Sequence, residues 1–232
     1  MNLILKTLLI GMAPLLMHAS LITGNLLTNP GAEDGNLTGW TAGGGTGADV
    51  DNGSFDPGIN PFDGSFDFYG GVGNGFGLGT LSQTNSIVTG AVTTALIDTG
   101  TLSANISFWV QSLDQDIPSD EAFVELTYLN GSNGVIDTVD TPAFYSIGTW
   151  TNFNNDYAIP AGTRSITYTM GFVREKGLNI DSFVDDNVLD ISGGLETPEP
   201  SMFGIVFTGI AACAVCLRRK RRTAPGVTSA IS

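Results

Sequence analysis

The fold is decided by the stretch Ile106-Ser107-Phe108-Trp109-Val110-Gln111, in which every second residue is branched or aromatic and fully apolar. Side chains of a β-strand alternate between two faces, so the first, third and fifth residues share one face. We predict that this face packs in a core. The remaining three residues carry a hydroxyl, an indole and an amide, and we predict that they lie on the outer side of a sheet.

The same alternation recurs along most of the chain, between turns rich in Gly, Asn and Asp, and helix signals are nearly absent. Predicted strands cover residues 78–85, 91–98, 102–113, 122–129, 135–139, 149–158, 165–173 and 180–191. Short strands at such intervals predict an all-β fold, an antiparallel β-sandwich formed by one exported domain at residues 20–194.

The charge of this domain is strongly one-sided. All 23 acidic residues lie between Glu33 and Glu199, and the same stretch holds only Arg164, Arg174 and Lys176 as basic residues. We therefore expect no nucleic acid and no anionic lipid as a partner, because phosphate groups are bound by cations. Divalent cations are the natural counter-ions, since Asp and Asn supply the hard oxygen ligands that calcium prefers. Solubility through net charge is the plainer alternative for most of these carboxylates.

Several catalytic groups are missing from the domain. The only His is His18 and the only Cys residues are Cys213 and Cys216, all outside residues 20–194. A Ser-His-Asp triad, a Cys nucleophile, a His-ligated zinc site and a disulfide framework are thereby excluded from it. We expect a protein that is not an enzyme. The alternative is a carbohydrate-active hydrolase with two carboxylates, although spacing singles out no pair.

The N-terminal residues have the pattern of a secretory signal. Lys6 precedes an apolar stretch at residues 8–16, and Met17-His18-Ala19 ends with a small residue at the cleavage position. We predict a signal peptide at residues 1–19 and export by the secretory pathway.

The C-terminal residues have three parts in a fixed order. A linker at 195–201 contains Pro198-Glu199-Pro200, an apolar run at 202–217 predicts a transmembrane helix, and the tail 218–232 begins with Arg218-Arg219-Lys220-Arg221-Arg222. The apolar run is just short of the about 17–25 residues that usually span a bilayer, and the cations stop transfer on the cytoplasmic side.

This order resembles the PEP-CTERM signal of Gram-negative bacteria. The resemblance implies an exosortase-like membrane protease as a partner, with cleavage near Pro198-Glu199-Pro200. It also implies an inner-membrane anchor before processing, then delivery to the cell surface or an extracellular polysaccharide. A permanent single-pass anchor is the alternative, and the sequence does not decide between them.

The two ends of the domain carry a second resemblance. Asn25-Leu26-Leu27-Thr28-Asn29-Pro30-Gly31-Ala32-Glu33 with the later Gly39-Trp40, and the closing segment Asp181-Ser182-Phe183-Val184-Asp185-Asp186-Asn187-Val188, are similar to a galactose-binding-like jelly roll. Many domains of this type are carbohydrate-binding modules. The resemblance implies a structural calcium ion held by Glu33 with Asp185 or Asp186, only one of which faces it if strand pairing is regular. The alternative is a set of exposed turn carboxylates, and we interpret the acidic segment 49–56 as a polar turn.

Sugar binding requires aromatic platforms and hydrogen-bonding groups on the surface. Trp109, with Gln111 two residues further on the same face, is the best candidate, and Tyr69 is a possible rim contact. Trp109 packed under a loop is the alternative. Trp40 and Trp150 are predicted to be core residues.

The sequence therefore favours a cell-envelope or extracellular matrix protein with a non-catalytic β-sandwich that binds or organises exopolysaccharide. Besides the hydrolase, the alternative is a purely structural or adhesion protein without a small ligand.

Overall fold

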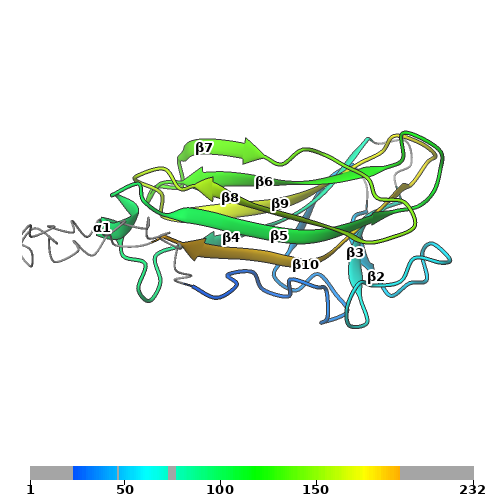
Figure 1. The fold of residues 1–232 in the computed structure, drawn as a ribbon, viewed down its shortest axis with the longest axis horizontal. Helices are drawn as coiled ribbons and strands as arrows, with labels where there is room; N and C mark the ends of the chain where they lie inside the picture. The colour runs from blue at the N-terminus through cyan, green and yellow to red at the C-terminus, as the bar shows by residue number, and fades with distance from the viewer. Residues whose placement is uncertain (1–22, 46, 73–76, 194–232) are drawn as a thin grey trace, which may run out of the picture. The chain divides into compact units, whose positions relative to one another are not determined.

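Ten β-strands and one short helix form within the residues that the computed structural model describes, which are 23–45, 47–72 and 77–193 (Figure 1). In chain order they are β1 (Thr41–Gly44), β2 (Asp49–Asp51), β3 (Asp67–Gly71), β4 (Leu78–Ser86), α1 (Thr94–Ile97), β5 (Ser103–Ser112), β6 (Glu121–Leu129), β7 (Val135–Asp140), β8 (Thr151–Ala158), β9 (Ser165–Val173) and β10 (Ile180–Ser192). All described residues belong to the first of two units into which the chain divides, Met1–Gly194.

The strands form two five-stranded antiparallel sheets. The β9 sheet has the order β1-β4-β9-β6-β7, and the β10 sheet has the order β2-β3-β10-β5-β8. Their apolar faces pack against each other, which confirms the predicted antiparallel sandwich and matches a jelly-roll topology. Helix α1 lies at one end of the sandwich, and β2 and β3 lie at the other (Figure 1).

Strand β5 alternates as its sequence predicts. Ile106, Phe108 and Val110 are buried between the sheets, whereas Ser107 and Trp109 are partly exposed on the outer side of the β10 sheet.

Trp40 is a core residue, as predicted, although it lies before β1. Its ring meets that of Phe68 edge-on with centroids 5.2 Å apart, and its indole N–H donates to the carbonyl of Asn29 at 3.0 Å. Both ends of this amphipathic side chain are thereby satisfied within the domain.

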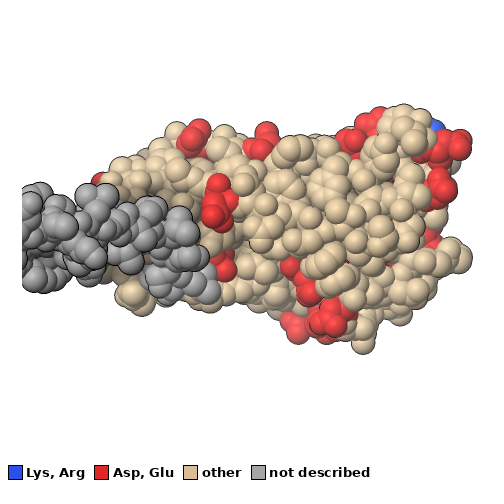
Figure 2. Space-filling model, in the orientation of Figure 1, with Lys and Arg blue, Asp and Glu red and all other residues tan. Residues whose placement is uncertain are grey.

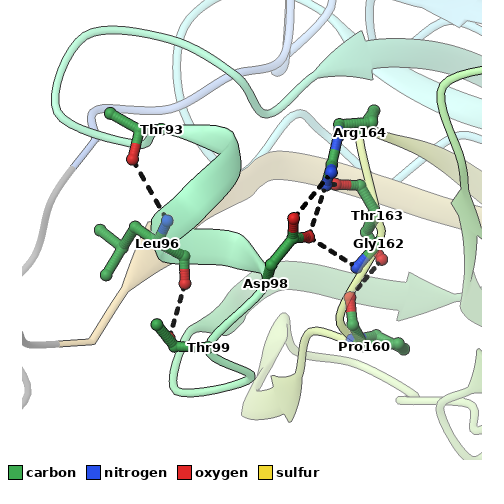
Figure 3. Close-up of polar contacts among 8 residues, drawn as sticks. All are labelled: Thr93, Leu96, Asp98, Thr99, Pro160, Gly162, Thr163 and Arg164. Carbon is green, nitrogen blue, oxygen red and sulfur yellow. Dashed lines mark hydrogen bonds and ion pairs between the residues drawn. The ribbon is translucent and has the colours of Figure 1, made fainter.

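The strand predicted at residues 91–98 is wrong, because the chain there forms α1 (Figure 3). The hydroxyl of Thr93 accepts the N–H of Leu96 and so caps the helix, whose adjacent residues Leu96 and Ile97 are both buried. Asp98 ends the turn and forms a two-pronged ion pair with Arg164 at 2.9 and 3.0 Å.

Three strands were not predicted, because β1, β2 and β3 are short and rich in Gly or Asp. They are extended because neighbouring strands pair with them: β1 adds to β4, β3 adds to β10, and β2 adds to β3. The opening residues 25–35 form turns and irregular backbone. They are held to β10 by hydrogen bonds such as that from the Leu26 N–H to the Leu189 carbonyl at 2.8 Å.

The predicted sorting elements lie outside the described residues. These are the signal peptide at 1–19, the motif Pro198-Glu199-Pro200, the apolar run 202–217 and the basic tail with Arg218-Arg219-Lys220-Arg221-Arg222. Within the described ranges, no helix has the length and apolar character needed to cross a membrane.

Acidic side chains form scattered patches on an otherwise uncharged surface in the view of Figure 2, where hardly any basic side chain is visible. Several of these patches lie toward the end of the sandwich opposite α1, and others lie along its lower edge in this view.

Candidate functional site

The predicted sugar contacts lie on one outer face, that of the β10 sheet. Strand pairing places Phe183 of β10 between Tyr69 of β3 and Gln111 of β5, and Trp109 opposite Asp185. Because residues paired across a sheet point to the same side, all five side chains share this face.

A loop covers most of this face. The connection between β2 and β3, residues 52–66 (the covering loop), folds back over the β10 sheet. Its Phe55 packs on Tyr69 with ring centroids 4.3 Å apart, and its Phe62 stacks on Trp109 at 3.9 Å with 16° between the planes. Trp109 therefore packs under a loop, the second of the two alternatives, and its ring is not a free platform.

A hollow of about 460 Å³ remains beside the covering loop. It is lined by Gly58, Asn60, Pro61, Phe62, Gln111, Gly148, Thr149 and Trp150. Phe62 is 39% exposed and Trp150 is half-buried, so the prediction that Trp150 is a core residue is wrong. The Trp150 indole N–H donates to the carbonyl of Asn60 at 3.0 Å and ties the covering loop to the start of β8.

The hollow has the chemistry of a sugar contact. Phe62 and Trp150 meet edge-on with centroids 6.2 Å apart and present two aromatic rings, while Gln111 and Asn60 bring carboxamides. Rings of this kind stack on apolar sugar faces, and amides bond hydroxyl groups. Phe62 was missed because its role depends on a contact with β5, although an aromatic residue in a Gly, Pro and Asp segment is a weak signal.

Two carboxylates, the buried Asp185 and the exposed Glu33, hold the covering loop in place. Oδ2 of Asp185 accepts the N–H groups of Phe62 and Asp63 at 2.9 and 3.2 Å, and the Glu33 carboxylate accepts those of Ser65 and Phe66 at 3.0–3.1 Å. The predicted metal ligands Glu33 and Asp185 thus position the stretch that carries Phe62.

The side chains of Asp185 and Asp186 border the same space, although neighbouring side chains of a regular strand point to opposite faces of the sheet. Strand β10 is bulged between Asp185 and Val188, and Asp186 has a φ of 47°. A β-bulge allows neighbouring side chains to turn to one side. A Cβ on Gly31 would lie 3.2 Å from Oδ1 of each of the two, so both oxygens border one small space beside that glycine.

Asp67 is a further carboxylate in this group, and no sequence pattern indicates it. Val184 pairs with Phe68, so Asp67 and Asp185 are neighbours across β3 and β10. Asp67 is fully buried, and neither of its carboxylate oxygens has a hydrogen-bond partner. Burial and the charges of Asp185, Asp51 and Glu33 raise its pKa to about 9, and burial raises the pKa of Asp185 to about 7 against the opposing backbone N–H groups.

These residues fit a cation in part. Among the described residues, no three His, Cys, Asp or Glu side chains stand close enough together to hold a metal ion. Nevertheless the orphaned Asp67 carboxylate and the shared space at Gly31 are features that a calcium ion would satisfy, since it takes six to eight oxygen ligands. Calcium at Glu33, Asp185 and Asp186 stays a prediction, with Asp67 as an added ligand.

The acidic segment 49–56 forms a polar turn, as interpreted. The Asp51 carboxylate accepts the N–H groups of Gly53, Ser54 and Phe55 at 2.9–3.2 Å and is thereby occupied within its own turn.

Comparison with known proteins finds similarity in structure alone. No protein-family model and no curated protein matches the chain. The enzymatically active domain of tailspike protein 4 of bacteriophage CBA120 is similar with a TM-score of 0.51 and 11% identity, over 72% of this chain and 21% of that one. A cyclase from Fischerella sp. TAU has a TM-score of 0.50 and 12% identity, over 77% of this chain and 100% of that one. The carbohydrate-binding module TmCBM61, in complex with β-1,4-galactotriose, has a TM-score of 0.49 and 19% identity, over 72% of this chain and 98% of that one. At these identities the common feature is the β-sandwich fold, and the chain spans only a fifth of the tailspike domain.

Proposed function

We propose that this protein is a non-catalytic polysaccharide-binding module of the cell envelope, which holds a glycan in the hollow beside Phe62 and Trp150. The observation that carries this proposal is the pair of partly exposed rings, fixed over β5 and next to the carboxamides of Gln111 and Asn60. Stacking plus amide hydrogen bonding suits a neutral sugar chain.

A binding role is favoured over hydrolysis by the lining of the hollow. Among the described residues that line it, none is Asp or Glu. Glycoside hydrolysis needs two carboxylates about 5–10 Å apart on either side of the scissile bond. The carboxylates nearby, Asp185 and Glu33, are instead bonded to backbone N–H groups of the covering loop.

The first test is a glycan array with the native protein. The second is affinity electrophoresis, in gels that contain those polysaccharides that the array identifies as ligands. Phe62→Ala and Trp150→Ala should each weaken binding by on the order of 2 kcal/mol, roughly thirtyfold in Kd. Val135→Ala is the matched control, because Val135 is an exposed apolar residue on β7 of the other sheet. A blank array with the native protein would refute sugar binding, and equal binding by all variants would refute this hollow. Release of reducing sugar would support the hydrolase instead.

A structural calcium ion is part of the proposal. Asp67, Asp185, Asp186 and Glu33 would hold it, and the ion would supply a positive charge beside these four carboxylates. Melting the protein with and without EDTA measures this contribution, and an unchanged midpoint would remove calcium from the proposal.

Sorting through the PEP-CTERM-like tail is the last part of the proposed function. We expect an exosortase-like protease to act near Pro198-Glu199-Pro200 and the product to reach the cell surface. Mass spectrometry of surface-released protein should find a C-terminus near this motif. Released protein that still ends at Ser232 would contradict sorting by cleavage.

A further inference from the structure

Three side-chain oxygens without a donor come together near the first residues of β10, and we propose that Asp181, Gln115 and Asp56 form a second divalent-cation site there. In these three residues, the buried oxygens without a hydrogen-bond partner are Oδ1 of Asp181, Oε1 of Gln115 and Oδ2 of Asp56. They belong to β10, to the loop between β5 and β6, and to the covering loop.

Asp181 is the centre of this site. Only 5% of the residue is exposed, yet Oδ1 of its carboxylate is unpaired. Its Oδ2 accepts the side-chain amide of Gln115, and its backbone N–H donates to Oδ2 of Asp120 at 2.7 Å. A buried carboxylate with an empty acceptor costs free energy unless a positive group completes it.

Gln115 places a carboxamide directly against Asp181. Its nitrogen bonds the carboxylate, while its oxygen is buried without a donor. The oxygen and nitrogen of a carboxamide exchange places by a half-turn of the group. With a cation present, the oxygen therefore turns toward the ion and joins the Asp181 carboxylate as a ligand.

Asp56 reaches the same place from the covering loop. The ring of its neighbour Phe55 lies edge-on to Phe183 with centroids 6.4 Å apart, which holds this part of the loop against β10. Burial raises the pKa of Asp56 to about 6, and among neighbouring charges that of Asp181 contributes most. Burial followed by the charge of Asp120 also raises the pKa of Asp181.

Asp120 adds charge to the site without being a ligand. Its Oδ1 accepts the N–H groups of Glu175 and Lys176 at 2.7 and 3.0 Å, and its Oδ2 accepts that of Asp181. Two carboxylates and one carboxamide remain as ligands. The described residues contain no metal-binding group of three His, Cys, Asp or Glu side chains, and this set has only two such side chains, because its third ligand is Gln115. Hard oxygen donors of this kind, completed by water and carbonyls, suit calcium.

The site would hold one end of the covering loop. Asp56 lies before the hollow residues 58–62, and the Asp185 contacts follow directly at Phe62 and Asp63. The loop would then be fixed at both ends by separate groups of carboxylates. The second cation site does not depend on whether the hollow binds a sugar.

Isothermal titration of the EDTA-stripped full chain with calcium chloride tests the site. Gln115→Leu and Asp56→Asn should weaken one binding event by roughly tenfold or more, and Asp181→Asn should abolish it. Asp114→Asn is the matched control, because it removes an exposed carboxylate next to Gln115 and should leave the titration unchanged.

The Asp67 variant separates the two sites. Asp67→Asn lies in the other carboxylate group, so it should retain the binding event that Gln115→Leu weakens. Gln115→Leu and Asp56→Asn alter partly exposed residues, so they decide the question even if Asp181→Asn does not fold. The proposal is overturned if the native chain binds no calcium, or if Asp67→Asn alone abolishes all binding. It is also overturned if Gln115→Leu and Asp56→Asn both bind calcium as the native chain does.

Discussion

Replacing Asp67 by Asn should reduce the pH dependence of stability of the metal-free protein by the share of one fully buried group. Asp67 is fully buried, its carboxylate oxygens have no donor, and its pKa is raised to about 9 from the usual 3.8. The folded state therefore holds a proton on Asp67 across a pH range in which the unfolded chain has released it. Asn has almost the same shape and cannot ionise.

The sign and size follow from proton linkage. Between the two pKa values the folded state binds more protons, so stability is greatest below about pH 4 and is lost as the pH rises toward about 9. The loss is about 1.4 kcal/mol per pH unit for one group, or about 3 kcal/mol between about pH 5 and about pH 7. For a domain of this size that corresponds to roughly 5–10 °C in Tm.

The assay is thermal melting in EDTA across this pH range, with circular dichroism as the readout of unfolding. The native protein should melt at progressively lower temperature as the pH rises, and the fall should be shallower in Asp67→Asn, in which the other buried carboxylates still titrate. Asp49→Asn, which removes an exposed carboxylate on the neighbouring β2, should leave the slope as in the native protein.

Calcium provides the second arm of this experiment. Adding it at neutral pH should raise the Tm of the native protein more than that of Asp67→Asn, because the ion would stabilise the ionised Asp67. Parallel pH curves for the native protein and Asp67→Asn in EDTA would refute the reasoning.

Tyr128→Phe should be neutral or stabilise the fold by up to about 1 kcal/mol, because the buried Tyr128 hydroxyl has no partner. Tyr168→Phe makes the same chemical change where the hydroxyl donates to Oδ1 of Asn187 at 2.9 Å, and it should cost about 1–2 kcal/mol. Urea denaturation of the two variants checks the contrast, and equal effects would contradict it. Gly171→Ala should cost about 1–3 kcal/mol, since the added Cβ would lie 2.2 Å from the Phe123 ring. The same titration in a Phe123→Ala background should show a smaller loss, and an unchanged loss would remove the clash as its cause.

The strands with strict alternation were predictable to within about two residues. Every second side chain is buried throughout β6 and over most of β5 and β9, and this period is a local property of the chain. The short strands β1 and β2 were not predictable, because β4 and β3 supply the hydrogen bonds that hold them extended. Residues 91–98 were mistaken for a strand because a four-residue helix is too short to show a helical period.

The predicted site residues came together only in part. Tyr69, Trp109 and Gln111 do share one face, as alternation and strand pairing require. The covering loop, however, lies over this face, and its Phe62 replaces Trp109 as the exposed ring. No pattern near Trp109 indicates this, since Phe62 is far away in the sequence.

The sequence by itself determined the all-β class, the acidic character of the domain and the absence of thiol and imidazole chemistry, because composition and a two-residue period need no partner. Only the tertiary structure decided which carboxylates are buried together and which aromatic ring faces solvent. Asp67 becomes unusual only when the fold buries it and β10 brings Asp185 beside it. The bulge that turns both Asp185 and Asp186 toward Gly31 depends on pairing with β5. Burial and electrostatic coupling are set by contacts between distant segments, and local spacing does not encode them.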